Sequence, residues 1–402
     1  MVTTISPDRL KDLLDGETEE SFVLVDTRPE ESYASWHVQG AKHFPFGSTE
    51  DLDADGRLED LRDLAGDADR VVTICATGIS SGNLASQVAE ASDEDLDVEV
   101  QAVDGGMKGW SGVYDRVPVD VGGDVRIVQL QRRAKGCLSY VVGCAETGAA
   151  AAVDPTEDVD EVKAAAEEVG LTIEAVIDTH VHADHVSGGR RLADDLDVPY
   201  YLSERAEARG LDYAFEPLAR NEVLPVGDLG LKALATPGHT SESISLLVED
   251  RALLTADTLH VDSVGRTELE FGEGEARSAS ETGSGDTASE GEEGARMLYE
   301  SLHATLLAEP EAVTVLPGHV TVTADGAFAV GRAGEPIATT VGEARTDIDV
   351  LQADEGAFLD RLADPGEEPA NYEAIIEINR GVEDLAPEER TDLELGPNNC
   401  SA

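Results

Sequence analysis

The sequence predicts two α/β domains, of which the second ends in a helical extension. A chain of 402 residues is longer than one ordinary hydrophobic core accommodates, so two domains are expected. Short apolar runs alternate with amphipathic stretches through residues 1–120, and after a connector at 117–124 the alternation restarts at Val125. We therefore place the two domains at residues 1–120 and 121–402.

The first domain contains three apolar runs and two amphipathic stretches. Helices are expected at 7–14 and 82–91, and strands at 22–26, 71–74 and 98–103. Strands that alternate with helices are typical of a parallel sheet covered by helices. The first domain is therefore expected to be an α/β domain.

The second domain opens with a run of strands. Strands are expected at 125–130, 138–142, 149–153 and 173–177, with a helix at 160–169. Residues 270–294 are rich in Gly, Ser and Glu and nearly free of apolar side chains, which predicts an inserted, mobile acidic loop. Residues 342–402 are expected to form a helical C-terminal extension, with helices at 355–362 and 371–378.

The net charge of −55, from 29 basic and 84 acidic residues, is extreme. Such self-repulsion destabilises a compact chain at low salt, whereas about 1 M salt shortens the Debye length to roughly 3 Å. Because the acidic residues are spread over the whole chain, we interpret them as an adaptation to a halophile's salt-rich cytoplasm. The chain offers no basic patch for nucleic acid and no run of 18 apolar residues for a membrane span. Its first residues do not resemble a secretory signal, so a cytoplasmic location is expected.

Metal-ligating residue types gather in short motifs. They are His180, His182, Asp184 and His185 in Thr-His-Val-His-Ala-Asp-His, His239 in Pro-Gly-His, His319 in Pro-Gly-His, and Asp257. Each group directly follows an apolar run, so a sheet that ends along one edge would bring these side chains together. Imidazole with carboxylate suits zinc or iron. For His37, His43, His260 and His303 we expect ordinary core or surface roles, and Cys137 and Cys144 are expected to be structural.

The HxHxDH motif, followed by Gly-His, Asp and Gly-His, resembles the metallo-β-lactamase superfamily from about Val125 onward. The resemblance implies an αββα sandwich. Within the superfamily four features resemble persulfide dioxygenases: THVHADH at 179–185, Gly-Arg-Thr at 265–267, MLYESLH at 297–303, and ANY with Ile-Asn at 370–372 and 378–379. Two residues depart from that pattern, because Glu268 replaces an Asp and Ala256 replaces a Gly. Arg266 is expected to contact an anionic substrate.

The resemblance to persulfide dioxygenases implies one Fe(II) held by His180, His239 and Asp257. Two His and one carboxylate leave open positions for O2 and substrate. The neighbours of these ligands would then orient them or move protons; they are His182, Asp184, His185 and His319.

A hydroxyacylglutathione-hydrolase-like enzyme would use the same residues to hold two Zn(II) ions. In this alternative, one ion binds His180, His182 and His239. The other ion binds Asp184, His185 and His319, and Asp257 bridges the two. A metal-bound hydroxide would then attack a thioester.

The first domain resembles the rhodanese family. The resemblance is carried by Asp-Thr-Arg at 26–28, by Gly-Gly-Met-Lys-Gly-Trp at 105–110, and by Cys75-Ala-Thr-Gly-Ile-Ser-Ser in the place of the active loop. Cys75 ends an apolar strand, and loop amides with a helix N-terminus stabilise an anion there. The loop Arg of the family is Ser80 in this chain, so a docking or carrier domain without turnover is the alternative to sulfur transfer at Cys75.

The sequence therefore predicts an α/β rhodanese-like domain followed by an αββα metallo-β-lactamase sandwich with a helical extension. The expected reaction is oxidation of a low-molecular-weight thiol persulfide by O2 to sulfite, with sulfane-sulfur transfer at Cys75. The alternatives are a dinuclear zinc thioester hydrolase and a non-catalytic sulfur-relay protein. The expected partners are the thiol persulfide and O2, with neither nucleic acid nor membrane, and a homodimer is left open.

Overall fold

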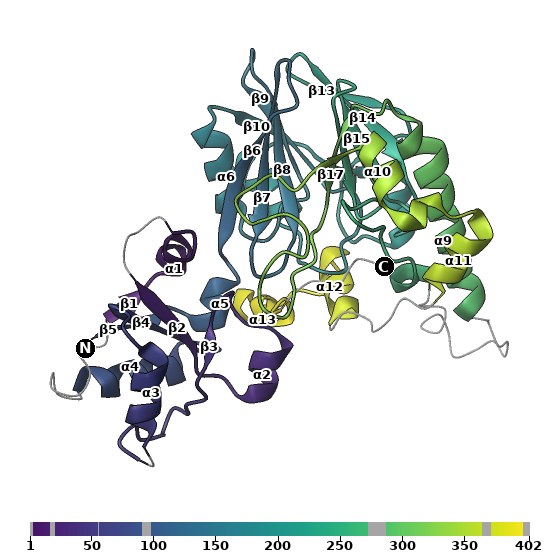
Figure 1. The fold of residues 1–402 in the computed structure, drawn as a ribbon. Coiled ribbons are helices and arrows are strands. Elements are labelled where there is room, and N and C mark those ends of the chain that lie inside the picture. The colour runs from purple at the N-terminus through teal and green to yellow at the C-terminus, as the bar shows by residue number, and fades with distance from the viewer. Residues whose placement is uncertain are drawn as a thin grey trace.

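The computed structural model describes residues 3–16, 21–54, 56–90, 98–271, 287–363 and 371–396. Figure 1 shows a smaller N-terminal domain at lower left and a larger part built from two sheets that pack face to face. We call the larger part the sandwich. Helices α12 (Tyr372–Asn379) and α13 (Pro387–Leu393) lie at the base of the sandwich, on the side of the N-terminal domain.

The N-terminal domain is built on a five-stranded parallel sheet. In spatial order its strands are β1 (Thr3–Ile5), β5 (Glu99–Val103), β4 (Arg70–Ile74), β2 (Phe22–Asp26) and β3 (Lys42–His43). The apolar faces of α1 (Pro7–Leu14) and α5 (Gly106–Trp110) pack on one side of the sheet, and those of α3 (Arg57–Ala65) and α4 (Ile79–Glu90) pack on the other. A further helix, α2 (Glu30–Ser35), follows β2.

The predicted strands and helices of this domain are present, with strand boundaries that differ by at most one residue and one larger shift at the start of a helix. Helix α4 begins at Ile79 and not at residue 82, because the Gly82 amide already donates a hydrogen bond to the Gly78 carbonyl. The helix therefore starts four residues after Cys75, close to the thiol.

The first sheet of the sandwich has seven strands. In spatial order they are β12 (Glu216–Leu218), β11 (Tyr200–Ser203), β10 (Thr172–Ile177), β9 (Ala149–Val153), β8 (Leu138–Cys144), β7 (Val125–Arg132) and β6 (Tyr114–Val119). Strands β6 to β9 are antiparallel and β9 to β12 are parallel. The connector predicted at 117–124 is wrong for residues 117–119, because β6 pairs with β7 over its whole length and forms an edge of this sheet.

The second sheet of the sandwich has six strands. They are β13 (Val223–Val226), β14 (Leu229–Ala235), β15 (Ile244–Val248), β16 (Ala252–Ala256), β17 (Thr314–Pro317) and β18 (Thr339–Thr340), in spatial order. Fully buried side chains of both sheets meet between them, such as Val142 and Ile177 from the first and Leu231 and Leu246 from the second. Burying apolar surface from both faces is what holds two such sheets together.

Helices cover the outer face of each sheet, which completes an αββα arrangement. Helices α6 (Val159–Glu168) and α7 (Gly189–Leu196) pack on the seven-stranded sheet. Helices α9 (Thr287–Glu300), α10 (Val341–Asp347) and α11 (Glu355–Leu362) pack on the six-stranded sheet. Shorter helical segments occupy Glu204–Arg209, Glu268–Phe271 (α8), Ser301–Thr305, Leu306–Ala308 and Asp349–Gln352.

The acidic loop predicted at 270–294 is wrong at both ends. Residues 270–271 belong to α8 and residues 287–294 to α9, while residues 272–286 lie outside the described part of the chain. Ala295 and Leu298, in the second half of α9, and Leu302, just after it, are buried against the sheet. These apolar side chains follow the polar stretch in the sequence, and they stabilise a helix whose first half lies within that stretch.

Contacts between the two domains include buried and partly buried charges and a buried apolar side chain. Arg133 Nη2 lies 2.7 Å from Asp15 Oδ2 of the N-terminal domain, and Arg133 Nε lies 2.6 Å from Asp115 Oδ2 of β6. Lys11 Nζ lies 3.1 Å from Asp115 Oδ1. Ala134 of the sandwich is buried in the core of the N-terminal domain.

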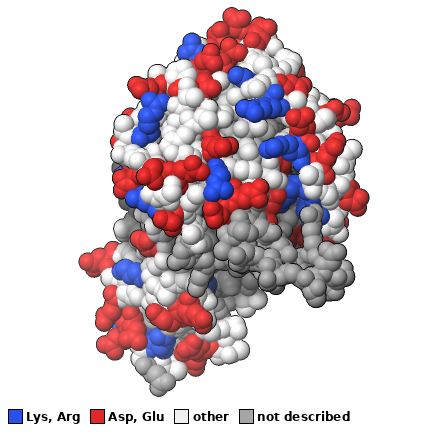
Figure 2. All heavy atoms as spheres, turned by 90° about the vertical axis from the view of Figure 1, so that its right-hand side faces the viewer, with Lys and Arg blue, Asp and Glu red and all other residues white. Residues whose placement is uncertain are grey.

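The surface is strongly acidic. Figure 2 shows Asp and Glu side chains scattered over the visible face, with fewer Lys and Arg side chains between them. Within the described ranges, no helix is both long and apolar enough to cross a membrane.

Candidate metal centre

The predicted metal-ligating residues converge at one edge of the sandwich. The motif that begins at His180 follows β10, His239 follows β14, Asp257 follows β16 and His319 follows β17. All of these side chains are buried, with exposed fractions of 3% or less. The expectation that strand ends bring the motifs together is confirmed by the distances below.

Three of these residues form a triad with a shared focus. His180 Nε2 lies 3.8 Å and His239 Nε2 lies 3.5 Å from Asp257 Oδ2. All three atoms are buried, and the described residues provide no hydrogen-bond partner for any of them. Buried polar atoms without a partner are costly, so three that face one point indicate a bound cation. Two imidazoles and one carboxylate fit Fe(II) or Zn(II).

The outer ring nitrogens of the triad are held by neighbouring groups. His180 Nδ1 lies 2.9 Å from Thr179 Oγ1, and His239 Nδ1 lies 2.8 Å from the carbonyl oxygen of Arg266. The carbonyl can only accept, so it fixes the proton of His239 on Nδ1 and leaves Nε2 as a lone-pair donor. This is the usual way in which an outer contact orients a histidine ligand.

Backbone geometry at Asp257 is unusually tight. A Cβ on Gly318 would lie 2.6 Å from Asp257 Oδ1, so the Gly-His turn places backbone where no side chain fits. Ala256 has a φ of +46°, in the left-handed region that favours glycine. Ala256 therefore adopts a backbone conformation that Gly would adopt with less strain.

Burial and neighbouring charges shift the titration of the triad. Burial lowers the pKa of His180 well below its usual range, and the positive charges of His182 and His239 act in the same direction. Burial alone would raise the pKa of Asp257, but His319 and other donors outweigh it and hold that pKa well below its usual range. His180 and Asp257 are therefore set to present a neutral imidazole and an ionised carboxylate, the forms that bind a metal.

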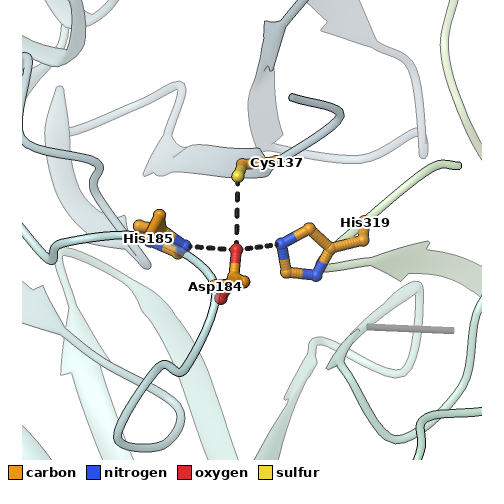
Figure 3. Close-up of side chains that lie close together, drawn as sticks. All are labelled: Cys137, Asp184, His185 and His319. Carbon is orange, nitrogen blue, oxygen red and sulfur yellow. Dashed lines mark hydrogen bonds and ion pairs between the residues drawn. The ribbon is translucent and has the colours of Figure 1, made fainter. Parts of the chain in front are cut away.

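A second cluster lies beside the triad and is internally hydrogen-bonded. Asp184 Oδ2 lies 2.8 Å from His185 Nδ1, 2.7 Å from His319 Nε2 and 3.3 Å from Cys137 Sγ, as Figure 3 shows. His319 Nδ1 lies 2.5 Å from Asp257 Oδ1, so His319 bridges the carboxylates of the two clusters. Burial opposes charge on His319, but Asp257 and Asp184 outweigh it and hold the pKa of His319 well above its usual range.

His182 turns away from the triad. Its Nε2 lies 3.3 Å from Asp154 Oδ1, and His182, Asp154 and Asp178 form a buried group of their own. Asp154 also accepts hydrogen bonds from the amide and hydroxyl of Thr179, at 2.7 and 2.9 Å. His182 is thus held next to the centre without joining the group formed by His180, His239 and Asp257.

Three residues near the centre were not identified from the sequence. His260 was expected to have an ordinary role, but it is buried with Nε2 3.6 Å from Asp257 Oδ1. Cys137 was expected to be structural, yet its sulfur contacts Asp184. Asp154 follows β9 directly, and its position at a strand end was the one available signal.

Arg266 is fully buried, so it is not an ordinary surface arginine. Its carbonyl oxygen holds His239. Contact between its guanidinium group and an anionic substrate stays a prediction.

The thiol of Cys75 lies at the end of β4, beside the start of α4. Its sulfur accepts hydrogen bonds from the Gly78 amide at 3.1 Å and the Ser81 hydroxyl at 3.2 Å. Burial opposes ionisation, but hydrogen bonds from Ser80, Ser81 and loop amides outweigh it and lower the pKa of Cys75. Ser80 takes the place of the loop Arg of the rhodanese family. As an uncharged hydrogen-bond donor, Ser80 therefore helps to stabilise the thiolate of Cys75.

Comparison with known proteins defines the class of each part. Residues 6–112 match the Rhodanese-like domain, and residues 132–319 match the Metallo-beta-lactamase superfamily. The chain therefore combines a rhodanese-like domain with a metallo-β-lactamase domain that continues into a helical C-terminal region, as the sequence predicts.

Relatives of the second domain include hydrolases and ETHE1. A hydroxyacylglutathione hydrolase from Rhodopseudomonas palustris is 35% identical over 148 residues, which cover 36% of this chain and 54% of that protein. This chain thus spans about half the length of the first curated relatives. A metallo-beta-lactamase structure from Staphylococcus aureus has 26% identity and a TM-score of 0.55, covering 66% of this chain and 75% of that one. ETHE1 from Myxococcus xanthus has 27% identity and a TM-score of 0.51, covering 64% and 98%.

Proposed function

We propose that this protein is an iron-dependent persulfide dioxygenase whose rhodanese-like domain transfers sulfane sulfur. The observation that carries the proposal is the contrast between the two clusters. Three partnerless ligand atoms of His180, His239 and Asp257 face one point, whereas Asp184 and His319 are already bonded to each other. The first group is therefore a prepared metal position, whereas a second ion at Asp184, His185 and His319 would require their mutual hydrogen bonds to open, which supports a single Fe(II) over two Zn(II).

The proposed reaction converts a thiol persulfide, O2 and water into the thiol, sulfite and two protons. The outer sulfur loses the four electrons that O2 takes up. A bound Fe(II) supplies open coordination positions at which O2 and the persulfide sulfur can meet. Burial of the centre excludes bulk water from this chemistry.

The neighbours of the triad orient the ligands and move protons. His319 lies between Asp257 and Asp184 with a hydrogen bond to each, and His185 contacts Asp184 in turn. This row of bonded groups can carry a proton away from the metal side without displacing a ligand. His182, held by Asp154, packs against the ring of His180 with 4.2 Å between ring centroids.

In the rhodanese-like domain, the Cys75 thiolate would attack the outer sulfur of a persulfide. A sulfur–sulfur bond forms on Cys75, the original one breaks, and the departing thiolate takes a proton. The hydrogen bonds from Gly78 and Ser81 would stabilise the resulting Cys75 persulfide anion as they stabilise the thiolate.

A dinuclear zinc thioester hydrolase is the second candidate. It is favoured by the similarity to hydroxyacylglutathione hydrolases and by the presence of all seven residues that such a site requires. For two ions to bind, the contact between Asp184 and His319 would have to open.

Oxygen uptake distinguishes the two functions. With Fe(II)-loaded protein and glutathione persulfide, we expect O2 consumption that matches sulfite release, and Asp257→Asn should abolish both. Cleavage of S-lactoylglutathione by the zinc-loaded protein, with no O2 consumption by the iron-loaded one, would contradict the proposal.

A further inference from the structure

The loop that carries most of the HxHxDH motif is held by side chains from the far end of the chain. We call residues 182–187 the metal loop. Asn379, the last residue of α12, donates hydrogen bonds from Nδ2 to the carbonyl oxygens of His182 and His185, each at 2.8 Å. Its Oδ1 accepts from the Ser187 amide at 2.9 Å. Three of the polar contacts of this one buried amide therefore fall on the metal loop.

Glu394, the residue after α13, makes a second attachment. One carboxylate oxygen accepts from the Val186 amide and the other accepts from Arg132 Nη1 at 2.8 Å. Glu394 and Arg132 are 2% and 5% exposed, so this is a buried ion pair. The backbone carbonyl of Glu394 also accepts from Lys135 Nζ at 3.1 Å.

These contacts determine the conformation of the metal loop. The loop lies at a strand end, and among the described residues its backbone forms one isolated β-bridge, between Ser187 and Thr156, and joins no strand of the sheets. Buried amides and carbonyls need partners, and leaving one unpaired costs roughly 1–3 kcal/mol. Asn379 and Glu394 supply partners for four of these groups at once, which a shifted loop would lose together.

The residues that hold the metal loop, and the helix α13 beside them, also contact the rhodanese-like domain. Arg132 donates from Nε to the carbonyl oxygen of Ser111 at 2.7 Å, and Lys108 of α5 forms an ion pair with Asp392 of α13. The segment that holds the metal loop is therefore itself held by the first domain. In Figure 1, α13 accordingly lies between the N-terminal domain and the sandwich, with α12 beside it at the base of the sandwich.

We propose that Asn379 and Glu394 are positioning residues for the metal centre: by holding the backbone of the metal loop they fix Asp184, which holds His319, which in turn holds the ligand Asp257. This inference rests on the proposed function of the HxHxDH region as a metal site. It assigns a role in metal retention to the C-terminal extension, whose described residues belong to none of the ligand groups.

The test compares Asn379→Ala with Asn371→Gly in the full-length protein. Asn371 lies just before the same helix, its side chain contacts the carbonyl of Leu393 and not the metal loop, and glycine tolerates its φ of +65°. We expect the dissociation constant for Fe(II) to rise about 10- to 100-fold in Asn379→Ala, with a changed spectrum of the Co(II)-substituted centre. Asn371→Gly should stay within about twofold of wild type, with an unchanged spectrum.

Two further measurements keep the inference testable if Asn379→Ala does not fold. Glu394→Gln keeps an acceptor for Val186 but removes the charge that faces Arg132, and it should also weaken Fe(II) binding. Hydrogen exchange of the metal-free wild type should show strong protection of the Val186 and Ser187 amides. Rapid exchange of these amides, or a folded Asn379→Ala with wild-type affinity and spectrum, would overturn the inference. A wild type that binds no metal would instead contradict the proposed function.

Discussion

His319 Nε2 lies 2.7 Å from Asp184 Oδ2, so two residues that a dinuclear site would need as ligands of its second ion are hydrogen-bonded to each other. Metal–ligand bonds of about 2.0–2.2 Å keep the donor atoms of one ion roughly 3 Å or more apart. The two donors are therefore too close to share an ion. In the triad, by contrast, the separations of 3.5 and 3.8 Å leave room for one.

Replacing His319 separates the two metal arrangements. In His319→Gln we expect the protein to retain one metal ion per chain, because His319 is not a ligand of a single-metal centre. Its affinity for Fe(II) should fall about tenfold, since His319 holds Asp257. His303→Gln, at a half-buried histidine that stacks on Tyr299, is the matched control. Metal analysis that shows a drop from two ions to one would support the dinuclear alternative.

The ionisation of Cys75 should depend on Ser81. The Ser81 hydroxyl donates to the sulfur and favours the thiolate, so Ser81→Ala should raise the pKa of Cys75. A hydrogen bond to a charged group contributes about 1.5–3 kcal/mol, or roughly 1–2 pH units. At a pH below both pKa values, alkylation of Cys75 by iodoacetamide should therefore slow about 10- to 100-fold.

Site-resolved mass spectrometry across a pH series measures this shift. Ser86→Ala is the control, because Ser86 lies on the same helix and donates to the Gly82 carbonyl. Equal profiles for wild type and Ser81→Ala would show that Ser81 does not stabilise the thiolate.

The contact between the domains should depend on Arg133. Arg133→Ala leaves the buried Asp115 with Lys11 as its cationic neighbour among the described residues, and breaking a buried ion pair costs about 3–5 kcal/mol. We expect a loss of this order in the free energy of unfolding, measured with urea. Arg296→Ala removes exposed ion pairs with Glu292 and Glu355 and should leave the free energy of unfolding nearly unchanged. Equal losses in the two variants would contradict a special role for Arg133.

Salt should stabilise the folded chain. With a net charge of −55, repulsion among surface carboxylates decreases as the Debye length falls from about 10 Å at 0.1 M to about 3 Å at 1 M. The thermal midpoint should therefore rise as KCl increases from about 0.1 M to about 2 M. A midpoint that stays constant or falls over this range would exclude adaptation of the surface to salt.

Local patterns in the sequence were enough to predict the sheets and the convergence of the ligand residues. Apolar runs identify strands, and His239, Asp257 and His319 each follow one directly, so their shared sheet edge could be inferred. Helix α9 was missed because its polar first half has the composition of a loop and is stabilised by the apolar residues that follow.

Contacts between distant segments could not be predicted. Cys137 lies 47 residues before Asp184, and Asn379 lies 194 residues after His185. Neither spacing nor composition encodes these pairings, because the first arises when the sandwich folds and the second when the C-terminal helix α12 packs on it. His260 lies three residues after Asp257 and belongs to no motif, so its contact with Asp257 could not be predicted either.

The number of iron ions per chain tests the central claim most directly. Protein reconstituted anaerobically with excess Fe(II), and then freed of unbound metal, should hold one iron per chain. His180→Ala should reduce that occupancy to near zero, because His180 donates one of the three converging ligand atoms. Two metal ions per wild-type chain would contradict a single-metal centre.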